Sequence, residues 1–297
     1  MSLQLDLFLD SRSVVLANEA ANALLARDAE RSAKCVAELR ALAPDHPNLE
    51  CFEILSHALA EWRQPTSDVA EISLAIETVE FVLAPAARQA LGPASALMLD
   101  ALFRDLARAS HGLPYDPTRA RAYEAWLSLR CGDWAEAEAA ALSIPRVAEV
   151  PDALHWLTVA RYRQRGLAAA RPTLFALAWY EPQRLAAVVG ELADELLERD
   201  FRSFECACEW ADIEANALAA WFPAWYVLEH PGASKDLDDL EPPARAPAKA
   251  AKLLVRIFEL ERRADWRALV ALREQLRLLS SDLFSLYMAP RVVRYLG

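Results

Sequence analysis

The chain has 297 residues, of which 55% are hydrophobic and 25% charged, and it contains 17 prolines but only 7 glycines. So few glycines argue against a sheet protein with many tight turns and against a glycine-rich phosphate-binding loop. The formal net charge of −11 argues against direct binding of duplex nucleic acid, because phosphate neutralisation needs clustered cations. Alanine, leucine, arginine and glutamate are abundant, and these residues favour helices.

Apolar residues recur every three to four positions along the first part of the chain, which predicts amphipathic helices. The first expected helix opens after the N-cap candidates Asp10 or Ser11. Prolines divide the others: the second stops at Pro44, the fourth is ended by Pro85, and Pro93 begins the next one. The helices are expected over residues 13–26, 29–42, 48–62 and 67–83, followed by one that ends at His111-Gly112.

The most informative stretch surrounds Gly132. We expect an amphipathic helix over residues 120–129, then a tight turn at Gly132-Asp133-Trp134 into a second helix. Gly166 follows 34 positions later, again between two expected helices, and Pro182 closes the unit. The glycine allows a sharp turn, Trp134 would pack between the paired helices, and the small Ala137 would let them approach.

This pattern resembles the tetratricopeptide repeat, a helix pair of 34 residues. The turn recurs as Ala264-Asp265-Trp266 and, more faintly, as Arg27-Asp28-Ala29. The resemblance is good over residues 118–182, moderate over 249–280 and weak over 13–110. It implies an all-α fold of stacked antiparallel helical hairpins, a TPR-like α-solenoid; an irregular helical bundle is the alternative.

The expected organisation has four parts. The segment 231–248 is rich in proline and acidic residues, and we interpret it as a solvated surface loop, although its acids could bind a cation or a basic partner. The parts are an N-terminal tail (1–12), a helical repeat stack (13–230), this loop (231–248) and a C-terminal helical hairpin that continues or caps the stack (249–297).

Residues that carry chemistry are scattered. The five histidines are dispersed, and Cys206 and Cys208 lie two positions apart, so they point to different sides of a helix and are interpreted as buried structural thiols. We predict no metal site, no cofactor and no enzymatic activity. An odd number of irregularly spaced cysteines, no secretory signal and no apolar run of about 18 residues predict a reduced, cytoplasmic protein without a membrane span.

Two groups of residues are candidates for a binding groove. Trp221, Trp225 and Tyr226 form an aromatic cluster of the kind that dominates binding hot spots, but core packing between hairpins is the preferred interpretation. Arg121 and Arg161 are candidates for the concave face of a repeat stack.

The N-terminal segment contains the most specific motif. Gln4-Leu5-Asp6-Leu7-Phe8 resembles the bacterial sliding-clamp-binding motif, Gln-Leu-(Ser/Asp)-Leu-Phe, at all five positions. The resemblance implies an extended segment in an apolar cleft of the clamp, with Gln4 hydrogen-bonding at the edge, Leu5 at the rim, Leu7 and Phe8 in the pocket and Asp6 facing out. The alternative is that the segment packs back and caps the first hairpin.

The leading functional expectation is a non-enzymatic scaffold or adaptor that binds a protein or peptide, with no direct nucleic-acid or membrane contact. An accessory factor in replication or repair, tethered to the clamp through residues 4–8, is the first alternative. An enzyme or small-ligand binder with a site that the sequence does not reveal is the second.

Overall fold

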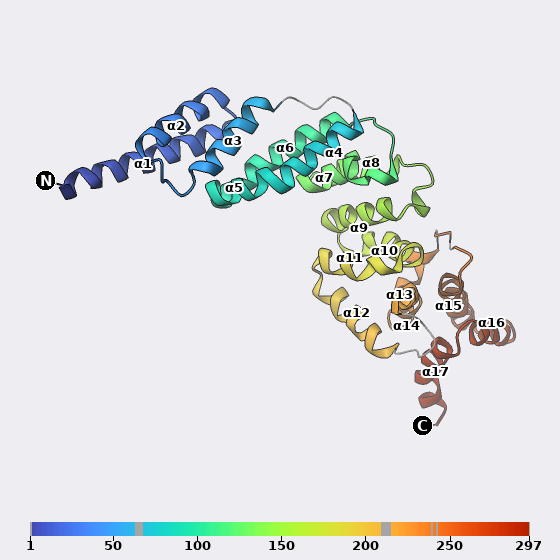
Figure 1. Cartoon of the computed structure of the whole chain (residues 1–297). Helices are drawn as coiled ribbons and strands as arrows, with labels where there is room; N and C mark the ends of the chain where they lie inside the picture. The colour runs from blue at the N-terminus through green and yellow to red at the C-terminus, as the bar shows by residue number, and fades with distance from the viewer. Residues whose placement is uncertain (1, 63–67, 209–214, 239, 242, 297) are drawn as a thin grey trace. The chain divides into compact units, whose positions relative to one another are not determined.

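Every regular element that the structure describes is a helix, which confirms the all-α class (Figure 1). The computed structural model describes residues 2–62, 68–208, 215–238, 240–241 and 243–296, and for residues 2–11, 215–216 and 290–296 it describes the backbone alone. Two compact units, Met1–Asp133 and Trp134–Gly297, are distinguished by their internal contacts, and each is described by itself.

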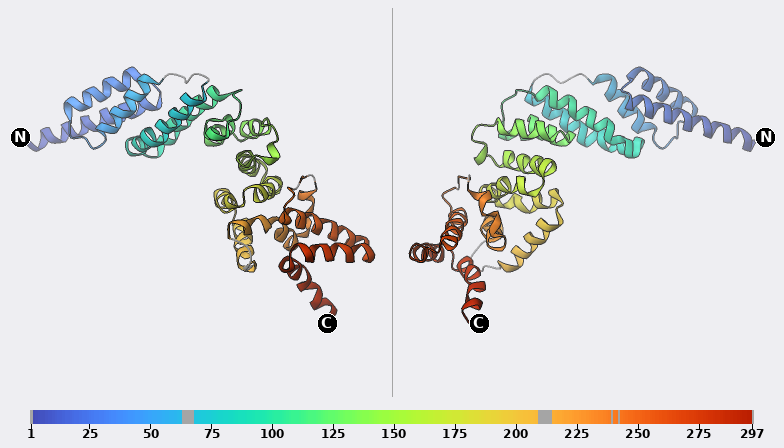
Figure 2. Two further views of the ribbon diagram at one scale, coloured as in Figure 1. Left: turned by 45° about the vertical axis from the view of Figure 1, so that its right-hand side comes forward. Right: turned by 180° about the vertical axis from the view of Figure 1, so that it is seen from behind.

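In the first unit, α1 packs on α2, α2 on α3 and α3 on α5, while α6 packs on α4, α5 and α7 (Figures 1 and 2). Their inward faces form one core that includes Leu24, Leu39, Phe52, Leu55 and Leu106. The helices are α1 (Ser2–Leu25), α2 (Ala29–Leu42), α3 (Leu49–Glu61), α4 (Val69–Thr78), α5 (Ala84–Leu91), α6 (Ser95–Ser110) and α7 (Glu124–Cys131), with the 3₁₀ helices η2 (Gly92–Ala94) and η3 (Pro117–Ala122).

The buried carboxylate of Asp105 joins three parts of the first unit. Its Oδ2 accepts hydrogen bonds from the Arg27 guanidinium at 2.6 Å and from the Trp62 indole at 3.0 Å. Its Oδ1 accepts one from Arg108 at 2.6 Å. The turn after α1 and the end of α3 are thereby fixed to α6.

Pro85 does not end the fourth predicted helix. A π-helical turn, η1 (Val79–Leu83), follows α4 and leads directly into α5, with Pro85 in the first turn of α5. Proline lacks an N–H group and is tolerated in the first turn of a helix. The chain therefore stays helical from Val69 to Leu91, but with a change of hydrogen-bond register at the π turn.

In the second unit, α8 packs on α9, α9 on α10, and α14 and α16 on α15 (Figures 1 and 2). The α-helices are α8 (Trp134–Leu142), α9 (Pro151–Arg165), α10 (Leu167–Tyr180), α11 (Leu185–Leu192), α12 (Glu195–Ala207), α13 (Ala215–Leu218), α14 (Phe222–Glu229), α15 (Ala246–Arg263), α16 (Trp266–Leu279) and α17 (Ser281–Leu296). The 3₁₀ helices are η4 (Val147–Glu149), η5 (Pro182–Arg184), η6 (Ala219–Trp221) and η7 (Pro231–Leu237).

The three turns that the sequence singled out share one backbone geometry. Gly132, Ala264 and Arg27 all lie in the left-handed region, with φ of 75°, 56° and 57°. In each turn the next residue, an aspartate, donates its backbone N–H to the carbonyl five positions earlier, at distances of 2.9–3.1 Å, which closes the preceding helix as a Schellman motif. Recurrence of this local turn does not by itself define a solenoid.

A fourth turn of related form was not anticipated from the sequence. Ala193 ends α11 with φ 53°, and Asp194 then caps α12 by accepting hydrogen bonds from the backbone N–H groups of Leu196 and Leu197. Asp28 and Asp265 cap α2 and α16 in the same way. A left-handed residue followed by a capping aspartate is therefore the recurrent helix connection of this chain.

The segment 231–248 differs from the expected solvated loop. Residues Pro231–Leu237 form η7, in which Ala233, Ser234 and Leu237 are buried. The side chain of Asp236, on the same segment, pairs with Nε of Arg171 on α10 at 2.7 Å. This tertiary ion pair explains why an acidic, proline-containing segment packs against the helices. Helix α15 begins at Ala246, inside the segment expected to be a loop; residues 239 and 242 lie outside the described part.

Candidate functional site

The motif residues Gln4, Leu5, Asp6, Leu7 and Phe8 do not form an extended tail. Their backbone belongs to α1, which begins at Ser2 rather than near residue 13. Their side chains lie outside the described part of the chain, so contacts of the motif remain a prediction. Docking as an extended segment would require this end of α1 to unwind.

The aromatic candidates lie in the core of the second unit. Trp221, Trp225 and Tyr226 are only 4–6% exposed. The Tyr226 ring lies 5.5 Å from that of Phe175, and the Trp225 ring lies 5.7 Å from that of Phe204. These three residues therefore do not line an open groove, and the structure agrees with the core interpretation.

The arginine candidates are already engaged by acids of their own units. Arg121 pairs with Glu80, and its guanidinium lies 4.7 Å from the centre of the Trp126 ring. Arg161 pairs with Glu138 at 2.8 Å. These two arginines belong to different units, so the structure does not bring them together in one described site.

Glu138 is the centre of a small charged cluster. It also pairs with Arg165, at 2.6 Å. Burial raises the pKa of Glu138, but the hydrogen bonds from Arg161 and Arg165 outweigh burial and leave the pKa below its ordinary value. The arrangement keeps Glu138 charged and occupies both arginines, which suits helix packing between α8 and α9 better than ligand capture.

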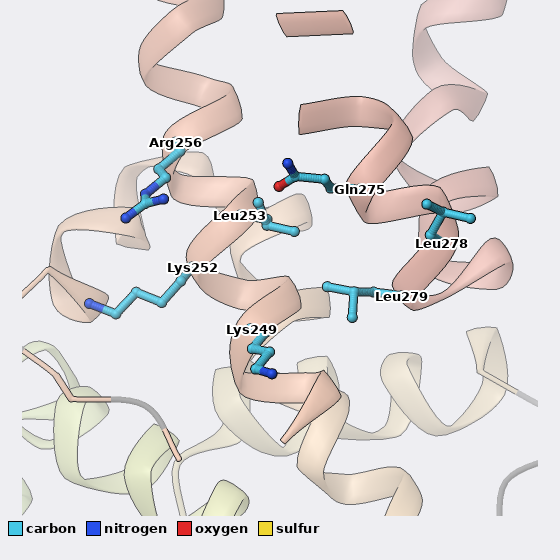
Figure 3. Close-up of a pocket in the computed structure, with 7 residues that line it drawn as sticks. All are labelled: Lys249, Lys252, Leu253, Arg256, Gln275, Leu278 and Leu279. Carbon is cyan, nitrogen blue, oxygen red and sulfur yellow. The ribbon is translucent and has the colours of Figure 1, made fainter. Parts of the chain in front are cut away.

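A groove that the sequence did not reveal lies between α15 and α16 (Figure 3). It has a volume of about 660 Å³. Leu253 of α15 points toward Gln275 and Leu279 of α16, while Leu278 lies at the outer side of α16 (Figure 3). Leu278 is 77% exposed. The lining residues are Lys249, Lys252, Leu253, Arg256, Gln275, Leu278 and Leu279.

The helix periodicity explains how these side chains share one surface. Lys249, Lys252, Leu253 and Arg256 follow each other at spacings that place them on one face of α15. The buried face of α15 is different and carries apolar residues such as Leu254 and Phe258. On α16 the groove residues are again three or four positions apart. The groove is thus the flank of a helical hairpin whose other side faces the core.

The groove is basic although the chain is acidic. None of its seven lining residues is an acid, and it holds two of the four lysines of the chain. Lys252 donates to the backbone carbonyls of Leu237 and Asp238, at the end of η7. Lys249 and Arg256 are exposed and form no ion pair within the described residues. The surface therefore combines leucine side chains with cations that are open to solvent.

A second apolar stripe lies on the first unit. Leu74, Phe81 and Val82 are 66%, 73% and 48% exposed and lie at successive turns of α4 and the π turn η1. Their neighbours on the outer face, Glu77 and Arg88, have opposite charges. This stripe has no charge pattern that specifies a partner.

The cysteines divide into buried and exposed thiols. Cys206 at the end of α12 is exposed, whereas Cys208 is buried, so the interpretation of both as buried thiols holds for Cys208 alone. Burial raises the pKa of Cys208 to about 12. The other three cysteines are buried as well.

The described residues were also compared with the requirements of a metal site and of a membrane-spanning helix. Within the described residues, no three His, Cys, Asp or Glu side chains come together in a way that would hold a metal ion. Among the same residues, no helix combines the length and apolar character needed to cross a bilayer.

Comparisons with known proteins found no match to this chain. No protein-family model matches the chain, and neither a curated protein nor a solved structure matches it.

Proposed function

We propose that the protein is a non-enzymatic scaffold or adaptor that binds another protein through the α15–α16 groove. The observation that carries this proposal is the combination of a highly exposed leucine, two half-buried leucines and open cations on one side of a helical hairpin. Apolar side chains on a surface gain free energy when a partner covers them, roughly 1.5–3 kcal/mol for a fully buried leucine.

The α-helical architecture supports the same proposal. In a stack of helical hairpins each pair is covered by the next, and terminal pairs usually present a polar outer surface. The α15–α16 hairpin instead leaves Leu278 and Val270 exposed. We propose that the chain is an irregular TPR-like stack whose C-terminal hairpin keeps an open side for a partner. The five free cysteines fit a reducing compartment such as the cytoplasm.

Site-specific photo-crosslinking in cells tests the proposal. The photoreactive amino acid p-benzoylphenylalanine replaces Leu278 in one variant and Leu196 in another, because Leu196 on α12 is also well exposed, at 60%. We expect a discrete adduct with another protein at position 278 and none of the same mass at position 196. The adduct should disappear in Lys249→Glu/Arg256→Glu.

The control variant Lys34→Glu/Lys235→Glu changes the net charge by the same amount at the two remaining lysines, both exposed and outside the groove. It should retain the adduct. Identical adducts from both crosslinker positions, or an adduct that both charge variants weaken equally, would contradict a partner site in the groove.

A second candidate function is attachment to the bacterial sliding clamp. It is favoured by the match of Gln4-Leu5-Asp6-Leu7-Phe8 to the clamp motif at every position. Binding of the intact chain to purified clamp, compared with Leu7→Ala/Phe8→Ala, tests it by surface plasmon resonance. Equal, negligible binding of both proteins would end this hypothesis without affecting the groove.

A further inference from the structure

We infer that the partner segment of the α15–α16 groove is an acidic amphipathic helix of two to three turns. This inference rests on the proposed function and adds the chemical class and the secondary structure of the partner.

The charge of the groove selects the charge of the partner. Lys249 and Arg256 lie seven positions apart on the same face of α15, both exposed, with no acid among the lining residues. Carboxylates placed opposite these cations gain attraction, whereas a basic segment would bring like charges together. The chain as a whole is acidic, with a net charge of −11, so a basic flank stands out as the favourable site for an acidic partner.

The apolar strip selects an amphipathic partner. Leu253 and Leu279 lie in the middle of the groove, and Leu278 extends the strip toward its outer side (Figure 3). A segment that carries acids alone would leave these leucines in contact with water. A partner with an apolar stripe and flanking carboxylates matches both features at once.

The shape of the groove favours a helix as the docked element. Both walls are helices whose lining residues recur at spacings of three and four, so they form parallel ridges with a furrow between them. A third helix fits such a furrow with anchors at positions i, i+3, i+4 and i+7. The lining stretch of α15, from Lys249 to Arg256, rises roughly 10 Å, which is about two helical turns.

A polyanion such as a single-stranded nucleic acid is the less favoured occupant. Only three cations line the groove, and one of them, Lys252, already donates to carbonyls of Leu237 and Asp238. Affinity for nucleic acid depends on the number of phosphates that are neutralised, and leucines contribute nothing to that. A second copy of the chain is another occupant that the experiment distinguishes.

Fluorescence anisotropy with labelled synthetic peptides tests the inference on the intact chain. The probe is a peptide of about 15 residues, long enough to form a helix, with leucines spaced three and four positions apart and glutamates on the other faces. One control peptide has lysine in place of every glutamate. Another has the acidic composition in an order that spreads the leucines around the helix.

The acidic amphipathic peptide should bind at least tenfold more tightly than either control peptide, and its binding should weaken as the salt concentration rises. Lys249→Glu/Arg256→Glu should lower its affinity at least tenfold, and Leu278→Ser should lower it severalfold. The matched charge variant Lys34→Glu/Lys235→Glu should bind as the parent chain does.

Three results would overturn the inference. The first is equal binding of the acidic, basic and reordered peptides. The second is tighter binding of a single-stranded oligonucleotide of the same charge, lost in Lys249→Glu/Arg256→Glu. The third is a dimer of the chain, seen by analytical ultracentrifugation, that the same substitutions dissociate. If the crosslinked adduct at position 278 persists while the peptides fail, the partner class is wrong and the scaffold function stands.

Discussion

Helices α10 and α16 have the same length, 14 residues, but opposite surroundings. In α10 eight side chains are buried, and neighbours cover it from several sides, including α9, α14 and η7. In α16 only Leu269 and Leu276 are buried. Composition accounts for part of the difference, because α10 has a single charged residue, Arg171, whereas α16 has four. Tertiary packing accounts for the rest, because neighbours cover α10 from several sides. The apolar residues of α10 stabilise the unit, whereas Val270 and Leu278 of α16 remain exposed.

The contrast between buried and exposed side chains should have its largest effect on the reactivity of the cysteine thiols. With a pKa of about 12, the buried Cys208 is a thiolate in only about one molecule in ten thousand at pH 8. Because pH 8 lies far below this pKa, the thiolate fraction of Cys208 grows about tenfold for each unit that the pH rises. Brief treatment of the native protein with iodoacetamide at pH 8 should label Cys206 alone, as peptide mass spectrometry would show. Equal labelling of Cys208 would mean that this part of the core opens readily.

Removal of a core ring on α10 should have the next largest effect. Phe175 is fully buried and contacts the rings of Phe222 and Tyr226. Phe175→Ala should lower the free energy of unfolding by about 3–5 kcal/mol, because it removes buried apolar surface and leaves a cavity. Urea denaturation followed by circular dichroism measures the loss. A change below about 1 kcal/mol would show that α10 is less closely packed than described.

A change at the turn between α15 and α16 should stabilise the protein. Ala264 lies in the left-handed region with φ 56°, where a Cβ atom is unfavourable and glycine is not. Ala264→Gly should raise the free energy of unfolding by about 0.5–1 kcal/mol. Gly132→Ala, at the equivalent turn of the first unit, should lower it by a similar amount. The same sign for both substitutions would contradict the shared turn geometry.

The smallest expected effect is at the open side of α16. Leu278→Ser should change the free energy of unfolding by no more than about 0.5 kcal/mol, because Leu278 is 77% exposed and therefore lies largely outside the core. The same denaturation experiment measures it. A loss of several kcal/mol would place Leu278 in the core and would leave the groove without its apolar strip.

Local features of the fold were predictable because they depend on residues close in sequence. The predicted limits of α2 agree with the structure, since Asp28 caps its start and the proline segment after Leu42 prevents continuation. The turns at Gly132 and Ala264 were found from a small residue followed by aspartate and tryptophan. The related turn at Ala193 was missed, because Glu195 follows Asp194 where the other two turns have tryptophan.

Features that depend on distant residues were not predictable in the same way. The packing of η7 depends on the ion pair between Arg171 and Asp236, which are 65 positions apart. The groove depends on which side of the α15–α16 hairpin is left uncovered by the other described residues. In the sequence Lys249, Lys252 and Arg256 look like an ordinary solvated helix face. Only the tertiary arrangement brings this face beside Leu278 and Leu279.

Hydrogen–deuterium exchange of the intact chain, alone and saturated with the acidic amphipathic peptide, tests the central claim most directly. A partner that binds the folded groove stabilises the helices that form it. The peptide should slow exchange in residues 249–256 and 275–279 and leave α9 and α10 unchanged. Bound peptide with no slowing in those two segments, or slowing confined to other helices, would contradict a docking site between α15 and α16.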